Sequence, residues 1–219
     1  MASTRAAAGD VRVLVVDNHD SFVHTLVGYL TELGADCDLV EADAMTDVAA
    51  AIAGRDGIVI SPGPGAPADA GASIAVVHAA ARAGIALLGV CLGHQAIGEA
   101  FAATVAHAPE LMQGMTSAVH HDGAGIFAGM PDPFTATRYH SLAIEPASVH
   151  SPLRVTATTA SGVVMGVAHE SLPIVGVQFH PESVLTEGGY RMLGTWLESI
   201  GVAGAAARGA GLHPHRAIG

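Results

Sequence analysis

The sequence predicts an α/β fold, an open and mostly parallel sheet covered by helices on both faces, with additional mixed or antiparallel strands in the second half. Three observations predict it. In the first half, short apolar runs alternate with amphipathic helical patterns, as in parallel sheets buried on both faces. After Thr104 the segments alternate, are rich in β-branched residues and are separated by Gly, Pro and Ser. With 219 residues, 50% of them hydrophobic, the chain is long enough for one well-cored domain.

Strands and helices alternate in the first half. Four apolar runs predict strands, at residues 11–16, 37–40, 57–60 and 86–90. Helical patterns lie between and after them, at residues 21–34, 45–54, 72–84 and from His94 onward. This alternation, without an internal repeat, is typical of β-α-β units with parallel strands.

The helix predicted over residues 21–34 has a start, an apolar face and a stop. Ser21 can accept hydrogen bonds from the free amides of the first turn as the N-cap. Leu26, Leu30 and Leu33 share one face, which we expect to be buried. Gly34 can adopt the left-handed conformation that closes a helix.

The second half adds strands and one closing helix. The predicted strands are 116–121, 134–139, 153–159, 162–170 and 173–179, and the helix is 189–201. We therefore expect a single domain over residues 11–201. The small polar residues at 1–10, and the Gly- and Ala-rich residues at 202–219, predict flexible tails.

The charges exclude several classes of function. The formal net charge of -11 argues against a nucleic acid or an anionic membrane as partner, because both require clustered basic groups. All nine basic residues are Arg, so the chain has no lysine for a Schiff base or for a phosphate-binding loop. No apolar run approaches the roughly 18 residues that a membrane span needs.

Cysteine content predicts a reducing compartment. The two cysteines, Cys37 and Cys91, are too few for a disulfide framework, and no secretory leader is recognisable. We therefore expect a cytoplasmic protein. Nothing in the sequence calls for a cofactor, and we expect none.

Three loops should meet at one edge of the sheet. The segments SPGPGAP at 61–67, CLGHQ at 91–95 and HPES at 180–183 each follow a predicted buried strand. Ligand sites of parallel α/β sheets gather beyond the carboxyl ends of the strands. These three loops are therefore the candidates for an active site.

Cys91 is the candidate nucleophile. It lies at a turn from strand to helix, where free amides and the helix dipole favour thiolate over thiol. Gly89 and Gly93 on either side allow a sharp turn and a close approach of substrate. Cys37, inside an apolar strand, is interpreted as a small buried hydrophobe.

His180 is the candidate base, and Glu182 is its partner. His180 follows the strand 173–179 at its carboxyl end, on the same predicted edge as Cys91. Residues i and i+2 of an extended segment face the same way, so Glu182 can bind one ring nitrogen while the other accepts the thiol proton. His94 is the rival base, but one helical turn beyond Cys91 its side chain should point away, which favours a structural role.

The glycine loop is better suited to an oxyanion hole than to a dinucleotide. It fits the dinucleotide fingerprint formally, but Pro64 and Pro67 remove amides that a pyrophosphate would use, and no acidic residue follows at ribose spacing. The amides of Gly63 and Leu92 can instead stabilise the charge of a tetrahedral intermediate. A plain turn is the alternative for this loop considered alone.

Metal sites are not expected. His120, His121 and Asp122 are adjacent in sequence and should mostly point apart, and HPHR at 213–216 has no further ligands at metal-site spacing. The segment RYHSL at 138–142 ends a predicted strand, and from the residues alone it could be either a site or a core edge.

Four motifs in order, SPGPG, GVCLGHQ, RYHSL and QFHPES, resemble those of the class I (triad) glutamine amidotransferases. VDNHDSF at 16–22 is similar to the small subunits of anthranilate synthase and aminodeoxychorismate synthase in particular. The resemblance extends from Val11 to Gly201. It implies a glutaminase subunit that passes ammonia to a chorismate-binding component I, for tryptophan or folate biosynthesis or both.

The resemblance also implies residue roles. Cys91 would form a γ-glutamyl thioester, with His180 as acid and base and Glu182 as its orienting partner. The implied glutamine and oxyanion site comprises Gly63, Pro64, Gly65, Leu92, Gln95, Ser141 and Leu142, the last two through their backbone. The roles of Ser141 and Leu142 rest on this resemblance alone. One departure is Met115, where relatives commonly have Lys after Gly114.

Two other functions stay open at this point. A stand-alone cysteine hydrolase of γ-glutamyl compounds would use the same three residues without a partner. A scaffold or regulatory module would leave the thiol incidental.

Overall fold

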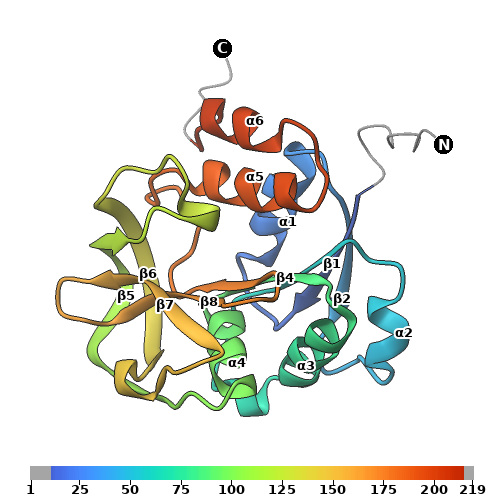
Figure 1. Ribbon diagram of the computed structural model, residues 1–219, viewed down its shortest axis with the longest axis horizontal. Helices are drawn as coiled ribbons and strands as arrows, with labels where there is room; N and C mark the ends of the chain where they lie inside the picture. Colours follow the sequence, from blue (N-terminus) through green and yellow to red (C-terminus); the bar gives the residue numbers. More distant parts are fainter. Residues whose placement is uncertain (1–10, 215–219) are drawn as a thin grey trace.

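The computed structural model describes residues 11–214, which form a sheet between two layers of helices (Figure 1). Within these residues one nine-stranded sheet has the order β2-β1-β3-β4-β9-β8-β7-β5-β6. The strands are β1 Arg12–Asp17, β2 Asp36–Glu41, β3 Gly57–Ile60, β4 Ala86–Val90, β5 Val105–His121, β6 Phe134–Ile144, β7 Leu153–Thr159, β8 Val164–His169 and β9 Ile174–Val177. The predicted fold class is confirmed.

The sheet changes from parallel to antiparallel at β9. Strands β2, β1, β3, β4 and β9 pair in parallel, and β8, β7, β5 and β6 continue the sheet in antiparallel pairs. Val90 of β4 lies beside Val177 of β9. The carboxyl ends of β4 and β9, which are far apart in sequence, are therefore neighbours.

Two apolar cores lie on opposite faces of the sheet. One joins the sheet to α1, α5 and α6, and the other joins it to α2, α3 and α4 (Figure 1). The helices are α1 Val23–Glu32, α2 Val48–Ile52, α3 Ser73–Ala83, α4 Leu92–Ala100, α5 Gly189–Ser199 and α6 Ala205–Gly211. Strands buried by helices on both sides account for the continuous apolar runs of the first half. None of these helices, within residues 11–214, is long and apolar enough to cross a bilayer.

The first helix differs from the prediction at its start. Leu26, Leu30 and Leu33 are fully buried, and Gly34 has a φ of +102°, as expected. Ser21, however, is not the N-cap: the helix begins at Val23, and the Asp20 carboxylate accepts from the Phe22 amide. The acidic residue one position earlier is the local hydrogen-bond acceptor.

The C-terminal segment is more ordered than the sequence predicts. Residues 205–211, which fall within the flexible tail predicted over 202–219, form α6 and pack against α5. Gly209 allows the close approach, because a methyl group there would lie 2.2 Å from the carbonyl oxygen of Tyr190. Small residues make this contact, so no apolar periodicity marks it in the sequence. The predicted tail over 1–10 and residues 215–219 lie outside the described residues.

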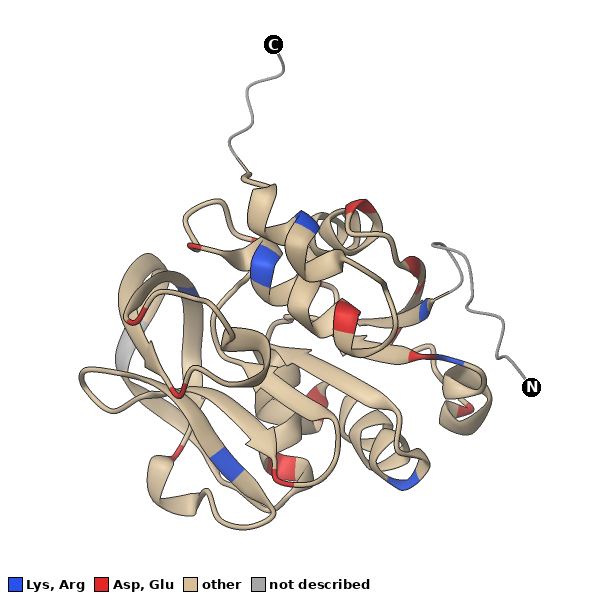
Figure 2. Cartoon of the chain, turned by 45° about the horizontal axis from the view of Figure 1, so that its top comes forward, with Lys and Arg blue, Asp and Glu red and all other residues tan. Residues whose placement is uncertain are grey.

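Charged residues are dispersed over separate elements (Figure 2). Asp38 on β2 pairs with Arg12 and Arg55, and Asp122 pairs with Arg154. The described basic residues therefore form no cluster of the kind that a nucleic acid needs.

The turn from β4 into α4 is packed against β3 without space for a side chain at Gly93. A methyl group on Gly93 would lie 2.3 Å from the carbonyl oxygen of Ile60, and one on Gly89 would lie 2.4 Å from the carbonyl oxygen of Gly93. Both backbone oxygens are fixed by the sheet and the helix. This close approach of the sheet to the start of α4 requires glycine.

Replacing Gly93 by Ala is therefore expected to lower the free energy of unfolding by about 1–3 kcal/mol, as overpacking does. Urea unfolding of the purified variant measures this. Gly28→Ala is the matched control, because Gly28 is exposed within α1 and a methyl group there meets nothing within 4 Å. Gly28→Ala should stabilise by up to about 1 kcal/mol. Equal effects of the two substitutions would contradict this description of the turn.

Candidate active site

Cys91 occupies a strained turn between β4 and α4. Its φ of +52° and ψ of -99° are rare for a residue with a side chain. The Cys91 amide donates to the carbonyl of Val177 at 2.8 Å, and the Cys91 carbonyl accepts from the Gln95 amide at 3.1 Å. The backbone is thus held by β9 on one side and by the first turn of α4 on the other. The thiol is presented at the edge of the sheet, as in a nucleophile elbow.

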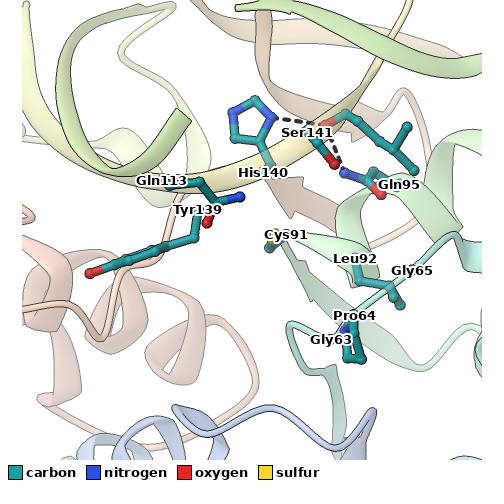
Figure 3. Close-up of a pocket in the computed structure, with 11 residues that line it drawn as sticks. Gly63, Pro64, Gly65, Cys91, Leu92, Gln95, Gln113, Tyr139, His140 and Ser141 are labelled. Atoms are coloured by element: carbon teal, nitrogen blue, oxygen red, sulfur yellow. Dashed lines mark hydrogen bonds between the residues drawn. The ribbon is translucent and has the colours of Figure 1, made fainter. Parts of the chain in front are cut away.

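A cavity of about 210 Å³ lies over Cys91 (Figure 3). It is smaller than the roughly 300–1,000 Å³ typical of pockets for drug-sized ligands, so a ligand the size of one amino acid suits it. The lining residues come from the glycine loop, the turn and start of α4, β5 and β6: Gly63, Pro64, Gly65, Cys91, Leu92, Gln95, Gln113, Tyr139, His140, Ser141 and Leu142. All seven non-triad residues implied by the resemblance are among them.

His180 and Glu182 form a buried pair behind the thiol. His180 Nδ1 lies 2.7 Å from Glu182 Oε1, and the two residues are 2% and 1% exposed. Because the carboxylate can only accept, Nδ1 donates, and Nε2 remains for a second partner. The loop is fixed to β6, because the His180 amide donates to the Thr137 carbonyl. Within the loop, Thr186 Oγ1 donates to the His180 carbonyl.

The surroundings raise the pKa of His180 well above its usual value. Burial alone would lower this pKa, but the neighbouring Cys91 side chain and the Glu182 carboxylate together outweigh burial. Nε2 has no hydrogen-bond partner among the described residues other than the neighbouring Cys91 thiol. It is therefore available to exchange a proton with the thiol.

Aromatic rings surround the imidazole. Phe22 and Tyr139 both contact His180 edge to face, with ring centroids 5.7 and 5.1 Å away, and they contact each other at 5.3 Å. These rings limit the imidazole to one orientation and shield the pair from water. Neither aromatic residue was singled out from the sequence. Tyr139 lies in RYHSL, so alternation along β6 could have placed it on the cavity side with Ser141.

Within RYHSL, the side chains of Arg138 and His140 fix the backbone of the cavity wall. Arg138 Nε donates to His140 Nε2 at 3.0 Å, and His140 Nδ1 lies 2.8 Å from the Leu142 carbonyl oxygen. A carbonyl can only accept, so His140 carries its proton on Nδ1. Gln95 Nε2 also donates to this oxygen, at 3.0 Å. The buried Arg138 and His140 therefore hold the Leu142 backbone that lines the cavity.

The alternative base and the second cysteine lie elsewhere. His94 is fully buried against Gly176 of β9, and burial lowers its pKa to about 3, which makes it a weak base. Cys37 is half-buried on β2, and burial raises its pKa to about 11, which keeps it a thiol. The placement of His94 agrees with the structural role predicted for it. Cys37 is only half-buried on β2, so the prediction of a buried hydrophobe is wrong in the degree of burial.

No metal-binding cluster is found among residues 11–214. His120 pairs with Asp132 at 3.3 Å, whereas His121 Nε2 lies 2.9 Å from the Pro131 carbonyl oxygen. Both histidines thus contact the segment 131–132, and that they mostly point apart stays a prediction.

Known proteins are similar to this chain in sequence. The model of the glutamine amidotransferase class-I family matches residues 14–199. Anthranilate synthase component 2 of Mycobacterium tuberculosis is 58% identical over 193 residues, covering 87% of this chain and 83% of the relative. Aminodeoxychorismate/anthranilate synthase component 2 of Bacillus subtilis is 45% identical, covering 85% of this chain and 96% of the relative.

A solved structure supports the fold. A glutamine amidotransferase from Thermotoga maritima superposes with a TM-score of 0.68 and 15% identity, covering 92% of each chain. At this identity the likeness concerns the fold only.

The buried pair gives a testable charge effect. In a Glu182→Gln variant the pKa of His180 should fall, because the carboxylate that stabilises the imidazolium is lost. Titration of the His180 ring by NMR measures this. Glu187→Gln is the matched control, since Glu187 is exposed and lies five positions further along. A midpoint that falls equally in both variants, or in neither, would rule out the pairing as the cause.

Proposed function

The chain belongs to the class I glutamine amidotransferase family, and from that premise we propose that it hydrolyses L-glutamine to glutamate and ammonia for a partner synthase component. The observation that carries the proposal is the Cys91 thiol, which faces an amino-acid-sized cavity in front of the buried His180–Glu182 pair. The size of the cavity supports glutamine as the substrate, and the succession of sulfur, imidazole and carboxylate supports the residue roles.

The first half-reaction forms a covalent intermediate. His180 Nε2 takes the Cys91 proton, and the thiolate attacks the carboxamide carbon of glutamine. The amides of Gly63 and Leu92 donate hydrogen bonds that stabilise the negative charge developing on the carboxamide oxygen. When the intermediate collapses, the carbon–nitrogen bond breaks and the imidazolium returns its proton to the departing ammonia. A γ-glutamyl thioester remains on Cys91.

The second half-reaction releases glutamate. His180 accepts a proton from water, which attacks the thioester carbon, and the sulfur leaves as thiolate. Glu182 holds the imidazole by Nδ1 throughout, so that Nε2 faces the sulfur at each step. Gln95, Ser141 and Leu142 line the opposite part of the cavity and would bind the α-amino and carboxylate groups of glutamine.

The ammonia is passed to a chorismate-binding component I. Support comes from the names of the relatives, which are second components of synthases. The 58% identical relative is named for anthranilate alone, which favours anthranilate as the product, and the Bacillus subtilis relative is named for both products. 4-Amino-4-deoxychorismate is thus the second candidate. The cytoplasmic location and the lack of a nucleic-acid partner stay predictions.

A stand-alone hydrolase of γ-glutamyl compounds remains the competing function. It would use the same thiol and imidazole without a partner. The small cavity supports glutamine over γ-glutamyl peptides, because a residue attached to the side-chain nitrogen would need further space. Turnover of such peptides by the chain alone would favour the competing function.

Replacing Cys91 by Ser should lower glutamine hydrolysis by about a thousandfold or more, as loss of a nucleophile does. Release of glutamate by the chain with its partner measures this. Cys37→Ser is the matched control, because Cys37 lies on β2 away from the cavity, and it should retain activity. Retained activity in Cys91→Ser would refute the assigned nucleophile.

The partner dependence has its own test. The tagged chain is used to capture a chorismate-binding protein, and the complex is then given chorismate and glutamine. We expect glutamate release to rise on complex formation and anthranilate to appear. Formation of 4-amino-4-deoxychorismate alone would reassign the pathway, and full activity without any partner would contradict the subunit role.

A further inference from the structure

Gln178 contacts the candidate nucleophile from inside the protein. It follows β9 directly, its backbone amide donates to the Met165 carbonyl at 3.0 Å, and it is fully buried. Its side-chain Nε2 lies 3.6 Å from Cys91 Sγ, within hydrogen-bond range of sulfur. Gln178 is not among the residues that line the cavity. Its side-chain amide therefore contacts the Cys91 sulfur and not a ligand in the cavity.

A chain of hydrogen bonds fixes which end of the Gln178 amide faces the sulfur. The Leu142 carbonyl oxygen can only accept, so Gln95 presents Nε2 to it, at 3.0 Å. The second hydrogen on this nitrogen points to Gln178 Oε1, 3.1 Å away. Because Gln178 accepts with its oxygen, its nitrogen must face Cys91. A reversed Gln178 amide would bring two donors together at Gln95.

An N–H group aimed at sulfur stabilises the thiolate more than the neutral thiol. Hydrogen bonds to a charged partner are roughly twice as strong as those between neutral groups. The surroundings are dry, since Gln178, Gln95 and Cys91 are 0%, 3% and 6% exposed, so water replaces this donor poorly. The donor is also pre-oriented, because its far end is held by Gln95.

We propose that Gln178 stabilises the Cys91 thiolate and fixes its position, with Gln95 and the Leu142 carbonyl orienting the amide. The proposal deepens the glutaminase function and rests on it for the catalytic consequence. It also links the substrate side of the cavity to the nucleophile, because Gln95 belongs to both. Gln178 thus acts on the sulfur in addition to His180 and Glu182.

Titratable groups surround the sulfur from the loop after β9, from α4 and from β6, whose Tyr139 and His140 line the same cavity as Cys91. His180, with Glu182 behind it, faces Cys91 from the loop after β9, and its imidazolium also favours thiolate. His94 on α4 is held neutral by burial, which lowers its pKa to about 3. Removal of Gln178 therefore leaves the His180 contribution in place, and the expected effect is a partial loss.

The direct test is the pH profile of Cys91 alkylation by iodoacetamide, read by mass spectrometry of the peptide that contains Cys91. Gln178→Met keeps the length of the side chain and removes both polar atoms. We expect the alkylation midpoint to rise by about one pH unit. With the partner present, kcat below that midpoint should fall by about tenfold.

Met165→Leu is the control for core disturbance. Met165 is fully buried on the adjacent strand β8 and belongs to the core cluster next to Gln178. This variant should keep the alkylation midpoint of the original chain, even if its thermal unfolding midpoint falls. A folded Gln178→Met variant with an unchanged alkylation midpoint would overturn the proposal, because a merely structural Gln178 would alter unfolding only.

A second measurement needs no substitution at Gln178. The side-chain amide signal of Gln178 in an NMR spectrum should shift with pH at the same midpoint as Cys91 alkylation, and this step should vanish in Cys91→Ser. Absence of the step in the unaltered chain would also overturn the proposal. Neither alkylation nor NMR uses glutamine, so failure of the glutaminase function would be detected separately, by its own assay.

Discussion

The positive φ of Cys91 is the constraint on which the site depends. A residue with a side chain occupies φ of +52° only when its surroundings hold it there. Here β9 holds the Cys91 amide, α4 begins at the next residue, and the bare backbone at Gly89 and Gly93 lets the sheet and helix approach. The same turn places the thiol at the sheet edge and the Leu92 amide beside it. The strained backbone at Cys91 is thus what exposes the nucleophile at the edge of the sheet.

The order of strands in the sheet brings the other site residues to this turn. Because β9 lies beside β4, two residues that follow β9, Gln178 and His180, reach the sulfur. Gln178 contacts the sulfur from inside, and His180 faces it with an imidazole whose pKa is raised by Cys91 and Glu182 despite burial. The antiparallel strand β6 then anchors the His180 loop and supplies one wall of the cavity. The parallel strands β4 and β9 therefore position the reacting groups, and the antiparallel strand β6 supports them.

Local sequence patterns predicted most strands and the three central residues of the candidate site. The features that they did not predict depend on contacts between distant segments. Apolar runs predicted the strands, and their carboxyl ends predicted Cys91, His180 and Glu182 as neighbours. The early part of β5 was missed because Pro109 and Gly114 interrupt the alternation, and its register to β6 shifts there. The pairing of Gln95 with Gln178 joins segments that no local period relates. Likewise α6 binds through small residues without an apolar stripe.

The central claim is that a substrate carbonyl becomes bonded to the Cys91 sulfur during turnover. Acid quenching of the complex during steady-state hydrolysis of isotopically labelled glutamine, followed by peptide mass spectrometry, tests it most directly. We expect a labelled glutamyl group on the peptide containing Cys91 and none on the peptide containing Cys37. Turnover at full rate with the label on another residue, or with no acyl group trapped on Cys91 even when hydrolysis of the intermediate is slowed, would contradict it.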